Sequence, residues 1–186
     1  EVMQERQVTI GRETHRVPNP FLVLATQNPI ENEGTYPLPE AQTDRFMMKV
    51  LVGYPSVTEE FVIVERALTP AAVIQRIIDP ETLVSLQEQA DRVYVDPSLI
   101  EFAVHLAHAT REPGRIGLDD LARYVTYGAS PRSSISLVLA ARALAFIRGR
   151  DYAVPADLLD LALDVLRHRL VLSYEALSDD VTADLI

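Results

Sequence analysis

The sequence has 186 residues, 48% of them hydrophobic and 24% charged, which are ordinary values for a globular protein. Seventeen basic and 27 acidic side chains give a net charge of -10, so the long-range field disfavours nucleic acid and anionic membranes as partners. The absence of Cys excludes disulfides, thiolate zinc sites and cysteine nucleophiles, and it fits a reducing compartment. Neither a signal-peptide pattern nor a membrane-spanning apolar run is visible, so we expect a cytoplasmic protein.

The first 55 residues carry β-type patterns. β-Branched segments at 7–10 and 14–17 flank Gly11-Arg12-Glu13, which predicts a short β-hairpin. Two continuous apolar runs, at 21–25 and 47–52, are typical of strands that are covered on both faces in a parallel sheet. Two strands and a hairpin are too few for a self-sufficient sheet, so we expect this part to belong to a larger α/β domain that begins upstream.

A loop that contains Pro and Gly separates the two apolar runs, with a short helical turn expected at 40–45. After residue 55 the pattern becomes helical, and most expected helices begin with a capping side chain followed by Pro. The expected helices cover 58–68 with Thr58 as its cap, 79–92, 96–110, 118–127, 130–149 and 155–170, with a short last one after Ser173. The sequence thus predicts an α/β part at residues 1–55 and an all-helical part at 56–186.

Asn28 is the first candidate for chemistry. It follows an apolar run, and ligands of open α/β sheets bind beyond the carboxyl ends of the strands. A carboxamide at that position can orient a water molecule or a phosphate oxygen. The alternative is that Asn28 only forms the turn before Pro29.

Arg45 is the second candidate, and it lies between Asp44 and Phe46. In one interpretation Arg45 forms a surface ion pair with Asp44 that contributes little. In the other, Phe46 anchors the backbone in the core while Arg45 points outward from a fixed position, as bidentate phosphate recognition requires.

Arg132 is the third candidate. Ser130 and Pro131 are a good N-cap and first helical residue, which puts Arg132 in the first turn of a helix. A cation is disfavoured there by the helix dipole unless an anion lies beside it. The alternative is a solvated Arg that bears a small penalty.

Metal sites have weaker support in the sequence. His105 and His108 are three residues apart on one expected helix, but paired acidic ligands are missing nearby. Glu31, Glu33 and Glu40 could hold a cation, although an acidic loop rich in Pro is usually solvated. We therefore expect no metal site formed by these residues.

The motifs that contain the three candidates occur in a recognisable order. The stretch "FLVLATQNPIENEGTYPLPEAQTDRF" is preceded by "QERQVTIG" and followed by "GYP" and, much later, by "GASPRS". This order closely resembles the MoxR family of AAA+ ATPases. The resemblance covers nearly the whole chain, and it is densest in residues 1–56 and 124–140.

The resemblance implies a role for each candidate. Asn28 matches sensor 1, which helps to position the attacking water, and Arg45 matches the arginine finger, which acts in the nucleotide site of the neighbouring subunit. Arg132 matches sensor 2, which contacts the nucleotide of its own subunit. The segment 7–17 resembles the pre-sensor-1 hairpin that faces the ring pore. The implied fold is the C-terminal remnant of a P-loop AAA+ parallel-sheet core at 1–55, followed by a helical lid domain at 56–186.

The resemblance also implies an activity and partners. MoxR proteins are associated with ATP-driven, chaperone-like maturation of other proteins, often by cofactor or metal insertion, and with partners that contain von Willebrand factor A domains. A full-length parent is expected to use ATP and Mg²⁺ in a homo-oligomeric ring, a hexamer, without nucleic acid. The sequence departs from the family in one respect, since it contains neither a G-x-x-x-x-G-K-[ST] loop nor an apolar strand that ends in Asp-Glu. We therefore expect the fragment alone to be inactive.

Two alternatives stay open from the sequence. One is a related AAA+ motor, of the magnesium-chelatase or helicase kind. The other is a non-enzymatic helical adaptor that retains an ATPase remnant for protein binding. An upstream phosphate loop with an intact Lys would favour either ATPase over the adaptor.

Overall fold

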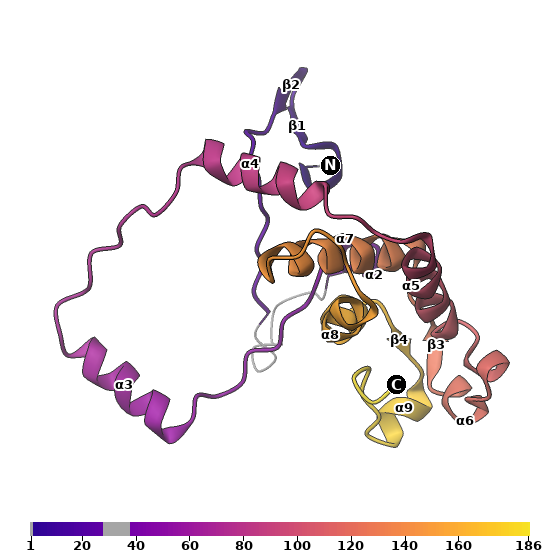
Figure 1. The fold of residues 1–186 in the computed structure, drawn as a ribbon. Coiled ribbons are helices and arrows are strands. Elements are labelled where there is room, and N and C mark those ends of the chain that lie inside the picture. Colours follow the sequence, from indigo (N-terminus) through magenta and orange to yellow (C-terminus); the bar gives the residue numbers. More distant parts are fainter. Residues whose placement is uncertain (1, 28–37) are drawn as a thin grey trace.

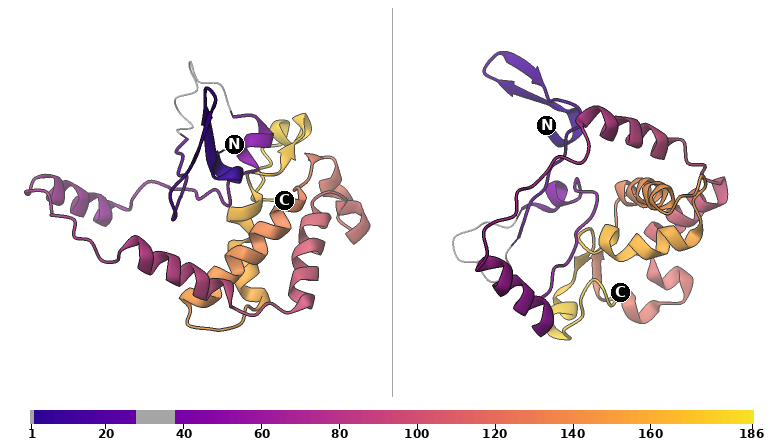
Figure 2. Two further views of the ribbon diagram at one scale, coloured as in Figure 1. Left: turned by 90° about the horizontal axis from the view of Figure 1, so that it is seen from above. Right: turned by 60° about the vertical axis from the view of Figure 1, so that its left-hand side comes forward.

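The computed structural model describes residues 2–27 and 38–186. A group of packed helices forms the body, and the N-terminal hairpin projects from it (Figure 1). Residues 50–79 form a long arm that leaves the body, carries one helix at its far end and returns, as all three ribbon views show (Figures 1 and 2). Within the described chain, no helix combines the length and the apolar character that a membrane crossing requires.

The predicted hairpin is confirmed. Strands β1 (Gln7–Ile10) and β2 (Glu13–Arg16) pair in antiparallel register, with Thr9 opposite Thr14. Gly11 has a φ of 66°, a left-handed conformation that glycine adopts without steric cost in a tight turn.

The two predicted parallel strands are wrong for the described chain. Neither 21–25 nor 47–52 is a strand, and the sheets in the described residues are two-stranded, β1 with β2 and β3 with β4. Leu22 and Leu24 are 77% and 85% exposed. An apolar run becomes a strand only where another strand accepts and donates its backbone hydrogen bonds, and no described strand lies beside these two runs.

Helices make up most of the ordered structure. They are α1 (Val2–Glu5), α2 (Glu40–Thr43), α3 (Val57–Ala67), α4 (Pro80–Asp91), α5 (Pro97–Ala109), η1 (Pro113–Ile116), α6 (Asp119–Ala122), α7 (Pro131–Ile147), α8 (Pro155–Leu166) and α9 (Tyr174–Ser178). The expected caps Asp79, Asp96 and Ser130 accept backbone N–H groups at the starts of α4, α5 and α7. The cap of α3 is Ser56 rather than Thr58, because the Ser56 hydroxyl accepts the Glu59 N–H while the Ser56 N–H donates to the Glu59 carboxylate, which completes a capping box.

The predicted helix at 118–127 is largely wrong. Its first part is the short α6, but its end is strand β3 (Val125–Tyr127), which pairs antiparallel with β4 (Val171–Leu172). This pairing also ends α8 at Leu166, before the predicted end at residue 170. A contact between segments that are distant in the sequence has therefore overridden the local helical pattern.

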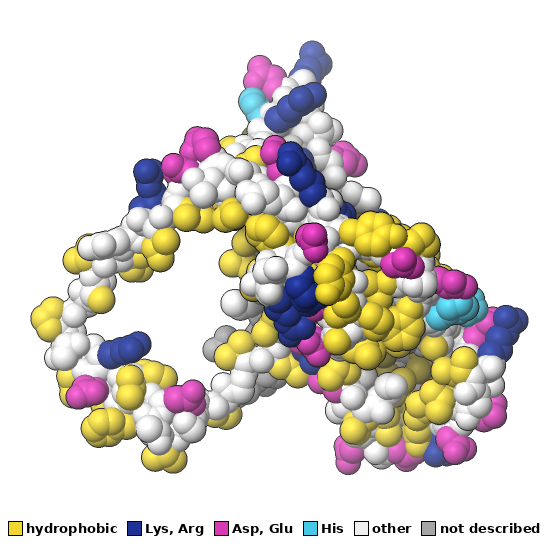
Figure 3. Space-filling model, in the orientation of Figure 1, with side chains coloured by type: hydrophobic (Ala, Val, Ile, Leu, Met, Phe, Trp, Pro, Cys, Tyr) yellow, Lys and Arg dark blue, Asp and Glu magenta, His cyan; other side chains and the backbone are white. Residues whose placement is uncertain are grey.

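The core lies in the helical body, where α7 packs against both α5 and α8. In the described chain, the buried hydrophobic residues all lie between 93 and 176, and Leu137, Leu158 and Val165 are completely buried. The arm is different, because its hydrophobic side chains are exposed on α3 and on the segment that follows it (Figure 3). The helical body, not the N-terminal part, is thus the stable platform for any site.

A buried carboxylate ties the loop after α7 to the start of α8. Asp157 is fully buried and accepts hydrogen bonds from Arg150 Nη1 at 2.8 Å, Arg148 Nη1 at 2.9 Å and the Val154 N–H at 2.9 Å. Hydrogen bonds, first of all from Arg150, outweigh burial and lower the pKa of Asp157 to about 2.

We predict that Asp157→Asn lowers the free energy of unfolding at neutral pH by on the order of 2 kcal/mol. Because the pKa of Asp157 is below its ordinary value of 3.8, its stabilisation is present above pH 3.8 and is lost as the pH falls towards 2. Urea unfolding at several pH values checks this, with the exposed Asp151→Asn as the control. A difference between wild type and variant that does not shrink in acid would contradict it.

Candidate functional site

The candidate residues divide between described and undescribed parts of the chain. Asn28 lies outside the described residues, and so do Glu31 and Glu33. Arg45 and Arg132 are described: Arg45 directly follows Asp44 in the chain, and Arg132 forms an ion pair with the Asp44 carboxylate. The site is therefore built from the segment after α2 and from the start of α7.

The loop before α7 is held in place by the end of α5. A Cβ on Gly128 would lie 2.5 Å from the Thr110 carbonyl oxygen, so only glycine permits this close approach. The Thr110 hydroxyl accepts the Ala129 N–H at 2.9 Å, and Arg111 Nε donates to the Ala129 carbonyl at 2.6 Å. These contacts fix the position of Ser130, the cap of α7.

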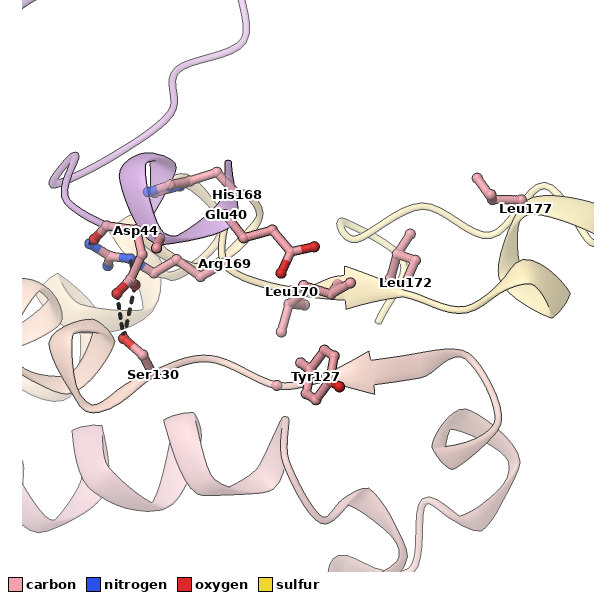
Figure 4. A pocket seen from close by; sticks show the side chains of 12 residues that line it. Glu40, Asp44, Tyr127, Ser130, His168, Arg169, Leu170, Leu172 and Leu177 are labelled. Carbon is pink, nitrogen blue, oxygen red and sulfur yellow. Dashed lines mark hydrogen bonds and ion pairs between the residues drawn. The ribbon is translucent and has the colours of Figure 1, made fainter. Parts of the chain in front are cut away.

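Asp44 is the centre of the site. Its two carboxylate oxygens lie 2.8 and 2.9 Å from the Ser130 hydroxyl, which donates to them (Figure 4). Arg132 Nη1 donates to the same carboxylate at 3.1 Å, and Arg169 Nε lies 3.2 Å from it. The surface ion pair with Arg45 is wrong for the described residues, because Asp44 forms ion pairs with Arg132 and Arg169 instead.

Arg132 has a neighbouring anion, as the first of its two interpretations requires for a cation in the first turn of a helix. That anion is the carboxylate of Asp44, beside the N-terminal end of α7. Arg132 Nη2 also donates to Gln4 Oε1 at 3.3 Å. Its side chain stays 44% exposed, so the guanidinium is accessible to a further anion.

Arg45 is exposed, and within the described chain its side chain has no hydrogen bond or ion pair. Its backbone is fixed on both sides. Arg169 Nη2 donates to the Asp44 carbonyl at 3.1 Å and to the Phe46 carbonyl at 2.7 Å. The sequence predicted that Phe46 packing anchors this segment, yet Phe46 is only half-buried, and backbone hydrogen bonds from a distant arginine supply the anchor.

The three basic residues between α8 and β4 were missed by the sequence analysis. Arg167 Nη1 donates to the Lys49 carbonyl at 2.7 Å, and His168 Nε2 lies 3.1 Å from the Phe46 carbonyl. Together with Arg169, they attach residues 44–49 to the helical body. Basic residues at the end of a helix are favoured by its dipole, so the pattern gives no reason to expect a longer-range role.

Burial changes the pKa of two of these groups. It lowers the pKa of His168 below its ordinary value of 6.5, opposed by the Phe46 carbonyl, so the imidazole is neutral at pH 7 and donates through Nε2. Burial also lowers the pKa of the Arg169 guanidinium, while the Asp44 carboxylate raises it and Arg132 lowers it. Arginine nevertheless stays charged at neutral pH, so Arg169 carries a buried positive charge that Asp44 compensates.

A pocket of about 490 Å³ lies beside this cluster. Asp44, Ser130 and Arg169 line one end of it, and Tyr127 and Leu172 line the other (Figure 4). A second pocket, between α1 and α2, is lined by Arg45 together with mainly apolar side chains. The short helix α2 therefore separates the pocket that contains Asp44 from the pocket that contains Arg45.

His105 and His108 have separate neighbours. His105 Nε2 lies 3.5 Å from Glu101, and His108 Nδ1 lies 3.6 Å from Glu112. Across residues 2–27 and 38–186, no three His, Asp or Glu side chains are placed to hold a metal ion together.

Two protein families match separate parts of the chain. Residues 1–48 match the family described as "ATPase family associated with various cellular activities (AAA)", and residues 120–186 match the AAA lid domain. "Chaperone MoxR1" of Mycobacterium tuberculosis is 49% identical over the whole chain, and "Protein MoxR" of Paracoccus denitrificans is 33% identical over 92% of it. This chain belongs to the MoxR family of AAA+ proteins.

A solved structure shares the fold of this chain. A protein from Cytophaga hutchinsonii, described as a candidate ATPase, matches 98% of this chain with a TM-score of 0.93 and 43% identity. The match covers 56% of that protein, and the chain spans 49% and 54% of the two MoxR relatives. The chain thus spans about half of the length of the MoxR proteins it matches.

The cluster around Asp44 joins the two matched regions of this MoxR chain. Asp44 lies in the AAA region, whereas Ser130, Arg132 and Arg169 lie in the lid region. One carboxylate and its three partners thus form contacts between the two regions, beside the hydrogen bonds of His168 and Arg169 to the Phe46 carbonyl.

We predict that Asp44→Ala lowers the free energy of unfolding by about 3 kcal/mol, because it leaves the buried Arg169 guanidinium without its counter-ion. The matched control is Asp160→Ala, which removes an exposed carboxylate from Arg148 and is expected to cost less than about 1 kcal/mol. Urea unfolding of both variants measures the difference. Equal losses in the two variants would contradict the role of Asp44.

Proposed function

We propose that this chain is the C-terminal part of a MoxR-type AAA+ ATPase that uses ATP and Mg²⁺ to remodel or mature other proteins. Family membership and the relative named as a chaperone support this proposal. The chain itself contains no phosphate-loop motif, so the proposal assigns nucleotide binding to a longer protein. In that protein, residues 1–55 would complete the AAA+ core and residues 56–186 would form the lid domain.

The observation that carries the proposal is the geometry of Arg45. Its guanidinium is exposed and has no polar partner among the described residues, while the Asp44 carbonyl before it and the Phe46 N–H after it are both hydrogen-bonded. A guanidinium that is held this way and left unpaired is suited to receive an anion from another molecule. We assign it the role of arginine finger, which stabilises the transition-state charge on the γ-phosphate bound by a neighbouring subunit.

Arg132 and Asn28 complete the proposed site. Arg132 is proposed as sensor 2, since it is exposed at the N-terminus of α7 and already binds a carboxylate. Phosphate oxygens use the same charge-assisted geometry. Asn28 remains a proposal from its motif alone, as the amide of sensor 1.

The assembly and its partners belong to the same proposal. An arginine finger that acts in trans requires a ring of subunits, and the resemblance to the family favours a hexamer. The proposed activity of the ring is cofactor or metal insertion into other proteins. A protein with a von Willebrand factor A domain is the proposed partner. The net charge of -10 supports protein clients over nucleic acid. The absence of Cys supports a cytoplasmic location.

The test is Arg45→Ala in the full-length protein that contains this chain. We predict that ATP turnover falls by about 10³-fold or more while nucleotide binding is retained, because an arginine finger acts on the transition state. Steady-state turnover and titration with a labelled nucleotide measure the two quantities. Arg115→Ala, which removes an exposed arginine from η1, is the control and should leave both unchanged. Unchanged ATP turnover in Arg45→Ala would contradict the role of Arg45 as an arginine finger.

A further inference from the structure

One guanidinium, that of Arg169, binds a backbone carbonyl on each side of Arg45. Its Nη2 donates to the Asp44 carbonyl at 3.1 Å and to the Phe46 carbonyl at 2.7 Å. The same nitrogen lies 3.1 Å from Ser136 Oγ in α7, and Nη1 donates to the Val165 carbonyl at 3.1 Å. The side chain of Arg169 is 1% exposed, so these bonds are shielded from water.

This arrangement constrains the short segment between the two carbonyls. The Asp44 carbonyl lies in the peptide plane before Arg45 and the Phe46 carbonyl in the plane after Phe46, so holding both planes limits the rotation of the two residues between them. The plane between Arg45 and Phe46 is held as well, because the Phe46 N–H donates to the Thr43 carbonyl at 3.1 Å. The direction of the Cα–Cβ bond of Arg45 therefore depends on the contact with Arg169. The guanidinium of Arg45 itself stays free of polar partners within the described chain.

The arrangement also joins two parts of the chain. Asp44 and Phe46 belong to the AAA region, whereas Arg169 and Ser136 belong to the lid region. Burying a guanidinium costs free energy unless its charge is paired, and here the Asp44 carboxylate pairs with it while four oxygens lie within hydrogen-bond distance of Nη1 and Nη2. A separation of the lid from residues 44–46 would break the bonds of Arg169 to Asp44 and Phe46 together.

We propose that Arg169 is a positioning residue for Arg45, which makes the geometry of the finger depend on the docking of the lid. This rests on the finger role proposed above and adds its regulation. A subunit presents Arg45 to its neighbour in the productive direction only while Arg169 holds the carbonyls of Asp44 and Phe46. The lid of one subunit thereby controls hydrolysis in the next subunit of the ring.

The first measurement is the turnover of Arg169→Met in the full-length protein. A misplaced catalytic group of this kind is expected to lower kcat by about 10²-fold, while KM for ATP stays within about twofold because the subunit's own nucleotide site is intact. Arg169→Lys keeps the charge but cannot reach both carbonyls through one planar group, so it should lie between wild type and Arg169→Met. If Arg169→Met fails to fold, the turnover of Arg169→Lys still tests the proposal. A raised KM for ATP with an unchanged kcat would overturn the proposal.

The second measurement is a mixing experiment that a merely structural role would not pass. Arg169→Met subunits are mixed with subunits whose phosphate loop is inactivated but whose Arg45 is intact, so that the first kind has strongly lowered turnover alone and the second has none. If Arg169 acts through the finger, the mixture regains turnover, since the second kind supplies fingers to the intact nucleotide sites of the first. The same mixture is made with Arg45→Ala subunits.

The two mixtures distinguish the possible failures. Recovery with both Arg45→Ala and Arg169→Met supports the proposal. Recovery with Arg45→Ala alone overturns the role of Arg169 and leaves the finger role in place. Recovery with neither overturns the action of Arg45 in trans, and with it the present inference.

Discussion

The buried ion pair between Asp44 and Arg169 is the contact on which the rest of the site depends. Arg169 Nε lies 3.2 Å from the Asp44 carboxylate, in a position that is nearly closed to water. The same carboxylate receives Ser130 from the cap of α7 and Arg132 from its first turn. Because a buried charge is tolerated only when it is paired, Asp44 and Arg169 hold each other in place. The proposed sensor 2, Arg132, binds the same carboxylate, and the backbone on either side of the proposed finger is bonded to Arg169.

Local features of this chain were predictable, because they depend on neighbouring residues. Gly11 marks the turn of the hairpin, and Ser130 followed by Pro131 marks the start of α7. For Arg132 the sequence left two interpretations open, and the structure shows the one with an anion beside the guanidinium. What the sequence could not reveal was the identity of that anion, since Asp44 is 88 residues away along the chain.

The errors have the same physical origin. The apolar run at 21–25 was expected to be a strand, but strands need partners, and pairing is not encoded within the run itself. The end of the predicted helix at 118–127 is strand β3 instead, because β4, more than 40 residues later in the chain, pairs with this strand. Arg169 stands just after a helix, where a cation is common, but the Asp44 carbonyl to which it donates is 125 residues away along the chain. The sequence therefore indicated the residues that are proposed to contact a nucleotide, but it gave no sign of Arg169, which is proposed to position Arg45.

The most direct test of this account is a double-mutant cycle on the chain itself, which combines Asp44→Ala with Arg169→Met and measures unfolding in urea. If the two side chains form the constraint described above, the loss in the double variant will be smaller than the sum of the single losses, with a coupling of about 1–3 kcal/mol. Losses that add to within about 0.5 kcal/mol would contradict it, since they would mean that Asp44 and Arg169 act independently.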